Sequence, residues 1–163
     1  MFYLLFGVII MKKIWIIHNS KYGNSEKIAK QLADGLKDSY DVSENSIKKI
    51  SPEDIAKDEP YGLIVAVRIV AFNSDREIRK FLREVDNFTT KPISKVAYFA
   101  THALGWKKLF IRGMKKTLKK IGCVEEVCPE FLEVKMQKPE GPAVEGADAK
   151  IGEFISTLKE FLA

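Results

Sequence analysis

The sequence predicts an α/β protein with three layers, in which a doubly wound, five-stranded parallel sheet is covered by helices on both faces. Two observations predict this class. Short apolar segments of strand length alternate with amphipathic segments of helical length, which is the pattern of repeated strand–helix–strand units. The chain has 163 residues, enough for one core with two sides and too few for two ordinary domains.

Five short segments have the composition of strands, and they lie at residues 14–17, 42–47, 63–67, 95–100 and 131–136. Residues 14–17 and 63–67 are continuous apolar runs, as expected of parallel strands that helices cover on both faces. Residues 42–47 are more polar, which favours the edge of the sheet. Because a helical segment follows each of these strands, we expect crossover connections and a parallel sheet.

Five amphipathic segments predict helices, at residues 25–36, from residues 51–54 onward, and at residues 75–85, 107–121 and 147–162. In the first of them, apolar residues recur every three or four positions. The second opens with a serine cap and a proline, and Pro60 limits it to a short helix. We expect the fourth to end at Gly122, because glycine readily terminates helices.

The chain is expected to form one domain over residues 11–163, preceded by an apolar extension at residues 1–10. This extension is uncharged and far shorter than the roughly 20 residues of a membrane-spanning helix. It also lacks the basic region that precedes the apolar part of a signal peptide. Met11 is followed by two lysines and a strand, which favours an alternative start codon at Met11 over a membrane anchor.

Composition excludes several classes of function. The two cysteines, Cys123 and Cys128, and the two histidines, His18 and His102, do not have the spacing of a metal or iron–sulfur site. Without a disulfide framework, a reducing, cytoplasmic location is expected. The net charge is +5, but the basic residues concentrate at residues 107–120 without a nucleic-acid-reading motif, so a solvated helix face is favoured over nucleic-acid binding.

Ligands of an open parallel sheet bind at the carboxyl ends of its strands. Three loops are expected there, at residues 18–25, 68–74 and 101–106. The first joins a buried strand to a helix and is rich in hydroxyl and amide side chains around Gly23. A phosphate requires such donors, together with the N–H groups of a helix N-terminus. The loop has neither the Walker pattern nor a Gly-x-Gly-x-x-Gly turn, so a monophosphate ligand is predicted.

The segment IIHNSKYGNS at residues 16–25, with its continuation to residue 32, resembles the flavodoxin signature. That signature has two apolar residues, an aromatic residue, and Thr/Ser-x-Thr-Gly-x-Thr at a helix start. His18 stands in place of the aromatic residue, and Ser25 replaces the last threonine but keeps the hydroxyl. Tyr22, in place of the middle threonine, is similar to the flavodoxin modules of flavodiiron proteins and related quinone reductases.

The resemblance extends from about residue 12 to the end of the chain, and it implies the sheet order 2-1-3-4-5 and FMN as the cofactor. It places six residues around the FMN phosphate: Ser20, Lys21, Tyr22, Gly23, Asn24 and Ser25. The competing interpretation of Ser25 is that it only caps the following helix.

The other two loops are implied to contact the isoalloxazine ring through Val70, Ala71, Phe72, Asn73, Thr101, His102, Ala103, Gly105 and Trp106. The second loop lacks the family's Gly-x-Pro, and its Phe72 is expected to cover one face of the ring. Arg68 either stabilises a reduced, anionic flavin or forms an ion pair. Trp106 is a candidate stacking partner or a core residue. His102 is a candidate hydrogen-bonding partner of the flavin or substrate, or plays no direct part.

The resemblance implies an FMN-binding redox flavoprotein that transfers electrons through a non-covalently bound cofactor. One alternative is an FMN-dependent oxidoreductase, similar to quinone reductases or to flavodoxin-type protoporphyrinogen oxidases. Another is a flavodoxin-fold binding module that has lost FMN. The expected partners are a redox protein or a small-molecule electron acceptor, with an anionic membrane surface as a further candidate for residues 107–120. The chain is expected to be a monomer or a homodimer.

Overall fold

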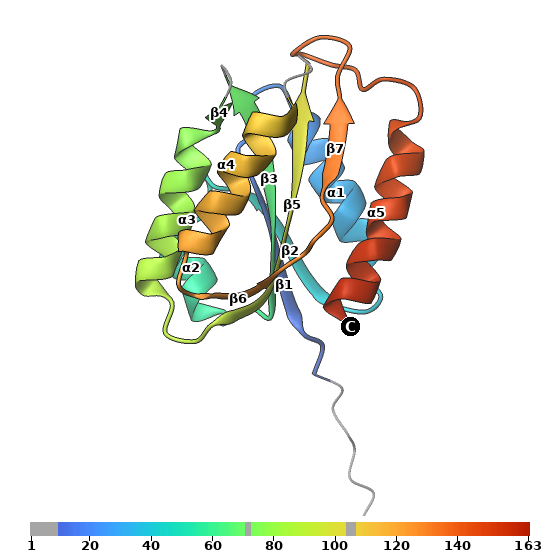
Figure 1. Cartoon of the computed structure of the whole chain (residues 1–163). Helices are drawn as coiled ribbons and strands as arrows, with labels where there is room; N and C mark the ends of the chain where they lie inside the picture. The colour runs from blue at the N-terminus through green and yellow to red at the C-terminus, as the bar shows by residue number, and fades with distance from the viewer. Residues whose placement is uncertain (1–9, 71–72, 104–106) are drawn as a thin grey trace, which may run out of the picture.

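The computed structural model describes residues 10–70, 73–103 and 107–163. In this part of the chain one sheet has the order β2-β1-β3-β5-β6, and these strands run parallel. Figure 1 shows the sheet between two helical layers, with α1 and α5 on one face and α2, α3 and α4 on the other. The predicted three-layer class and the order 2-1-3-4-5 are therefore confirmed.

The described strands are β1 (Lys13–His18), β2 (Asp41–Ser46), β3 (Gly62–Val70), β4 (Asn73–Ser74), β5 (Ile93–His102), β6 (Val124–Val127) and β7 (Leu132–Lys135). The helices are α1 (Asn24–Leu36), α2 (Pro52–Lys57), α3 (Arg76–Phe88), α4 (Lys107–Lys120) and α5 (Ala147–Leu162). All five predicted strands and all five predicted helices are present. Helix α4 ends before Gly122, and this glycine does not adopt the left-handed conformation.

Alternation along β1 explains why its apolar run has no polar interruption. Ile14 and Ile16 lie in the core beneath α1 and α5, whereas Trp15 and Ile17 lie in the core beneath α2, α3 and α4. Successive strand side chains point to opposite faces, and both faces of this sheet are buried. The two cores therefore account for the unbroken apolar run from Ile14 to Ile17.

The fifth position of the sheet differs from the sequence prediction, because two strands, β6 and β7, share it along β5. Val127 pairs with Val96 and Leu132 pairs with Phe99, so the edge advances five residues while β5 advances three. The backbone N–H of Cys128 still donates to Val96 O over 2.7 Å. This excess is a bulge, a common device at sheet edges. Residues 124–127 were not predicted as a strand.

The two cysteines are buried and unoxidised. Burial raises the pKa of the Cys123 thiol to about 12, and it also raises the pKa of Cys128. Because only the thiolate is nucleophilic, we expect neither thiol to react with DTNB within minutes at pH 8 in the folded protein, and both to react in urea. A fast reaction of either thiol before unfolding would contradict this packing.

In the described residues, no helix is long and apolar enough to span a membrane.

Candidate functional site

The three predicted loops follow β1, β3 and β5, which are adjacent in the sheet. Because these strands are parallel, the loops meet at one edge, at the top of Figure 1. Two of them are more regular than the sequence prediction suggested. Strand β3 continues to Val70, which pairs with Asn73 in an antiparallel connection to β4. Strand β5 includes Thr101 and His102.

The first loop ends at Gly23, the residue that caps the N-terminus of α1. Gly23 has φ 84°, a left-handed conformation that glycine adopts without strain, and no side chain caps the helix. A Cβ built on Gly23 would have no neighbour within 4 Å, so the space beside the helix start is open. The uncapped N–H groups and the helix dipole favour an anion at this position.

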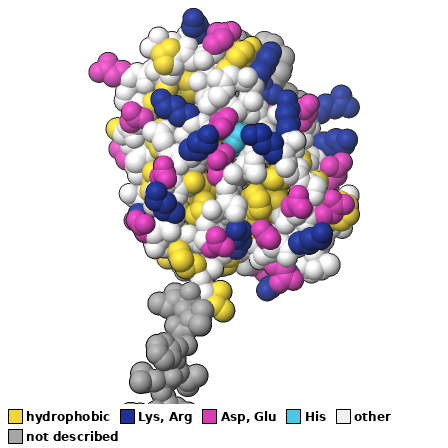
Figure 2. All heavy atoms as spheres, turned by 180° about the vertical axis from the view of Figure 1, so that it is seen from behind, with side chains coloured by type: hydrophobic (Ala, Val, Ile, Leu, Met, Phe, Trp, Pro, Cys, Tyr) yellow, Lys and Arg dark blue, Asp and Glu magenta, His cyan; other side chains and the backbone are white. Residues whose placement is uncertain are grey.

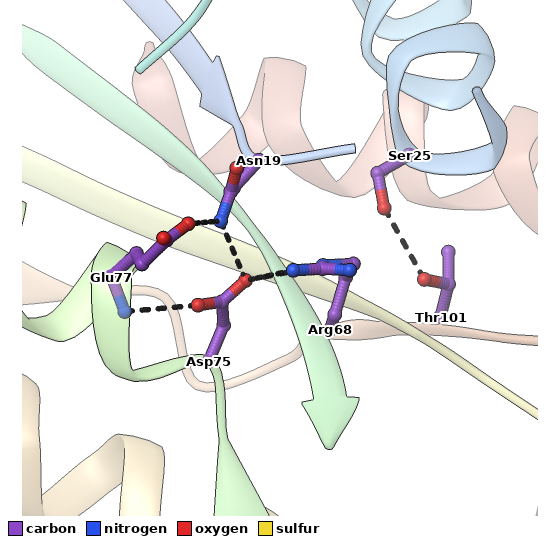
Figure 3. A network of polar contacts seen from close by, with 6 residues as sticks. All are labelled: Asn19, Ser25, Arg68, Asp75, Glu77 and Thr101. Carbon is purple, nitrogen blue, oxygen red and sulfur yellow. Dashed lines mark hydrogen bonds and ion pairs between the residues drawn. The ribbon is translucent and has the colours of Figure 1, made fainter. Parts of the chain in front are cut away.

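Ser25 is the second residue of α1 and does not cap it, so the capping interpretation is wrong. Its side chain is buried, and its Oγ lies 3.2 Å from Thr101 Oγ1 at the end of β5. Figure 3 shows the two hydroxyl groups pointing toward one another. The structure thus brings a residue of the first predicted loop into contact with a residue of the third.

The remaining residues of the first loop differ in exposure. Ser20 is half-buried, whereas Lys21 and Tyr22 are exposed, with the Lys21 ammonium 5.1 Å from the centre of the Tyr22 ring. The Asn24 amide donates from Nδ2 to Pro139 O over 3.2 Å. Its side chain therefore faces the loop after β7, and its backbone N–H is the group that it contributes at the start of α1.

A polar network, formed by Asn19, Arg68, Asp75 and Glu77, joins the first loop to the second (Figure 3). Asp75 Oδ2 accepts hydrogen bonds from Arg68 Nη2 and Nε at 2.9 and 3.1 Å, and from Asn19 Nδ2 at 2.9 Å. Asp75 Oδ1 caps α3 by accepting from the Glu77 backbone N–H over 2.9 Å. The Asn19 amide also donates to Glu77 Oε2 over 2.5 Å.

The network decides between the two interpretations of Arg68 in favour of an ion pair. Asp75 is almost fully buried, whereas Arg68 keeps about a quarter of its side chain exposed. Asn19 is 1% exposed, and its Oδ1 has no partner among the described residues. The sequence pattern places Asp75 only at the start of a helix and assigns no role to Asn19 or Glu77. The two contacts of the Asn19 amide, with Asp75 and with Glu77, join residues more than 50 positions apart, so no local signal in the sequence indicates them.

Both histidines lie at strand ends and contact a glutamate on a neighbouring strand. His18 Nε2 lies 2.5 Å from Glu44 Oε1 of β2, and His102 Nε2 contacts Glu133 Oε1 of β7. Both imidazoles are buried. His18 replaces the aromatic residue of the family signature, and its pairing with Glu44 shows how a polar ring is accommodated there. His102 is thus held within the sheet by Glu133.

Several predicted ring contacts lie outside the described residues, namely Ala71, Phe72, Gly105 and Trp106. Val70 and Asn73 are described through their backbone pairing, and Ala103 is half-buried at the end of β5. Their roles toward a flavin ring stay predictions. Within residues 10–70, 73–103 and 107–163, no group of three or more acidic, cysteine or histidine residues could hold a metal ion.

The donor set fits a phosphate monoester better than a metal or a diphosphate. An uncapped helix N-terminus, an open left-handed glycine and hydroxyl side chains lie together at one end of β1. Groups of this kind can satisfy the oxygens of a phosphate through neutral donors and the helix dipole.

Comparison with solved structures finds the same fold in several proteins. Oxidised flavodoxin 1 from Bacillus cereus matches with a TM-score of 0.71 and 17% identity, over 93% of this chain and 100% of that chain. A flavodoxin from Streptococcus pneumonia TIGR4 matches with a TM-score of 0.68 and 18% identity, over 91% and 98%. A flavo-di-iron protein variant from Thermotoga maritima matches with a TM-score of 0.67 and 25% identity, over 93% of this chain and 36% of that chain.

The sequence comparisons are consistent with this fold. The comparison with curated proteins finds no match in sequence. The family model described as flavodoxin matches residues 16–144, which include the first loop, the ends of β3 and β5, and the bulged edge. This match covers well over half of the chain. The chain therefore belongs to the flavodoxin family of FMN-binding electron-transfer flavoproteins.

Proposed function

We propose that this protein is an electron carrier that holds FMN non-covalently with its phosphate at residues 20–25. The observation that carries the proposal is the start of α1, where an open, left-handed Gly23 leaves the helix N-terminus without a side-chain cap. The N–H groups of the first turn, with the Ser20 and Ser25 hydroxyls, would bind the phosphate. Bound FMN would supply the one- and two-electron chemistry.

Contacts of the second and third loops hold the residues around the proposed cofactor site in place. The contact between Ser25 and Thr101 links the phosphate loop to the end of β5, and the Arg68–Asp75 ion pair fixes the two ends of the second loop. A site held in place before binding loses less entropy when the ligand arrives. We infer that Val70 to Asn73 and Ala103 to Trp106 lie against the flavin ring.

The burial and pairing of the described histidine and cysteine side chains favour an electron carrier over an FMN-dependent oxidoreductase. His18 and His102 are buried and paired with glutamates, and Cys123 is a buried thiol with a raised pKa. Catalysis by a side-chain acid, base or nucleophile requires that group to be within reach of the substrate, and none of these buried groups offers it. The cytoplasmic location and the choice between monomer and homodimer stay predictions.

The proposal can be tested with protein that is incubated with FMN, separated from free flavin by gel filtration and reduced anaerobically. We expect flavin absorbance bands to co-elute with the protein. The reduced protein should transfer electrons to cytochrome c, with no steady-state consumption of quinones or of protoporphyrinogen. The absence of flavin bands would favour the binding module, and sustained turnover of either substrate would favour an oxidoreductase.

A further inference from the structure

Helix α4 holds the positive charge of this protein. Its 14 residues include seven lysines or arginines and no acidic residue. The whole chain has 27 basic and 22 acidic residues, so the other 149 residues have 20 basic and 22 acidic residues, a net charge of −2. The excess of positive charge is therefore a local property of one helix and not a general property of the surface.

The described cations of α4 form one exposed stripe, which we call the basic stripe: Arg112, Lys115, Lys116, Lys119 and Lys120. Residues at this spacing of three and four positions share one face of a helix. None of the five forms an ion pair in the described part of the chain. Figure 2 shows the side of the molecule opposite to that in Figure 1, and there acidic and basic side chains are interspersed.

Helix α4 starts at the edge of the sheet that carries the proposed cofactor site and runs toward the opposite edge (Figure 1), so the basic stripe extends from about 8 Å to about 20 Å along the helix from that edge. The helix begins directly after the third loop, and it packs against β4, which pairs with the end of β3. Both neighbours belong to the loops that we propose to hold the flavin ring. Attraction between charges acts over such distances at low ionic strength, so a charged surface on the helix that starts at this edge steers an oppositely charged partner toward it.

The described apolar side chains of α4 belong to the core. Met114 and Leu118 of α4, and Ile121 just after it, are buried beneath the helix. A helix that lies in a membrane interface needs an apolar face free to enter the lipid. The exposed side chains among residues 112–120 are all lysine or arginine, so this surface fits a reversible electrostatic contact with a protein better than insertion into a membrane.

We propose that the basic stripe is the docking surface for an acidic electron-transfer protein. This inference rests on the proposed function, since it names the partner class of the same carrier. The contact is a transient encounter whose rate is set by long-range attraction, and salt screens it.

The test compares two haem proteins of opposite charge, acidic cytochrome b5 and basic cytochrome c, as one-electron acceptors. One electron passes from reduced FMN to the haem iron, which changes from Fe(III) to Fe(II). In the stripe variant Lys115, Lys116, Lys119 and Lys120 are replaced by glutamine, which retains high helix propensity. The control variant replaces four other exposed lysines by glutamine: Lys48, Lys57, Lys150 and Lys159.

We expect the stripe variant to reduce cytochrome b5 at least about tenfold more slowly than the parent at low ionic strength, with the difference shrinking to about twofold at high salt. The rate of cytochrome b5 reduction should fall much less in the control variant. The stripe variant should reduce cytochrome c no more slowly than the parent. The affinity for immobilised cytochrome b5, measured with and without FMN, should be lowest for the stripe variant and similar for the parent and the control variant. This measurement separates docking from electron transfer.

Two results would overturn the inference and leave the proposed function intact. In one, the parent reduces both cytochromes and the stripe variant does so at unchanged rates. In the other, the stripe variant loses only its binding to phosphatidylserine vesicles, which would make the stripe a membrane contact. If FMN-loaded parent protein reduces neither cytochrome, the proposed function fails instead.

Discussion

Replacement of Gly23 by valine is expected to weaken FMN binding by at least about 100-fold, or roughly 2.7 kcal/mol, without unfolding the chain. Gly23 has φ 84° at the N-terminus of α1, and a β-branched residue is strained in that conformation. The loop would relax to a negative φ, and the N–H groups of the first turn would no longer converge on the phosphate. Titration of FMN fluorescence against the apoprotein measures the affinity.

A second glycine provides a matched control. Gly146 has φ 83°, precedes α5 without a side-chain cap, and also has open space where a Cβ would stand. Gly146→Val imposes the same backbone strain at another helix start, so we expect a similar decrease in thermal stability and an unchanged affinity for FMN. Tight FMN binding by Gly23→Val, or an equal loss of affinity in both variants, would show that residues 20–25 do not hold the phosphate.

Replacement of Asp75 by alanine is expected to lower the free energy of unfolding by about 3 kcal/mol. The substitution leaves the partly buried Arg68 without its carboxylate, removes one acceptor of the buried Asn19 amide, and deletes the cap of α3. Asp75→Asn should lower the free energy of unfolding by less, because the asparagine amide oxygen can still cap α3. Urea unfolding of the apoprotein at pH 7 measures both effects.

An exposed ion pair serves as the control for this experiment. Asp34 contacts Lys37 one turn later on α1, and both side chains are largely exposed. Since exposed pairs contribute little to stability, Asp34→Ala should leave the urea midpoint nearly unchanged. Comparable midpoints for Asp75→Ala and Asp34→Ala would mean that the network between the first and second loops adds no stability.

The sequence predicts the β1–α1 unit well because its signals are local. Strand β1 is apolar from Ile14 to Ile17, where both of its faces are covered, and Gly23 marks the turn into α1 within the same short segment. The edge formed by β6 and β7 is different. Its bulge depends on how residues 127–132 register against β5, and a register between distant strands is not encoded in either segment alone.

The same distinction applies to the site. The proposed phosphate loop is contiguous, so its candidate donors could be chosen from spacing. The contact of Ser25 with Thr101 and that of Asn19 with Asp75 join residues 76 and 56 positions apart, and only the folded sheet brings them together. Periodicity also could not show that His102 is buried and paired with Glu133, because that contact depends on the position of β7 beside β5.

The most direct test of the central claim compares FMN with riboflavin, which has the same ring but no phosphate. If the uncapped start of α1 and the hydroxyls of residues 20–25 hold the phosphate, the apoprotein should bind FMN at 1:1 stoichiometry and riboflavin at least about 100-fold more weakly. Calorimetric titration at fixed ionic strength measures both affinities. Equal affinities for the two flavins, or no binding of FMN, would contradict this assignment of the loop.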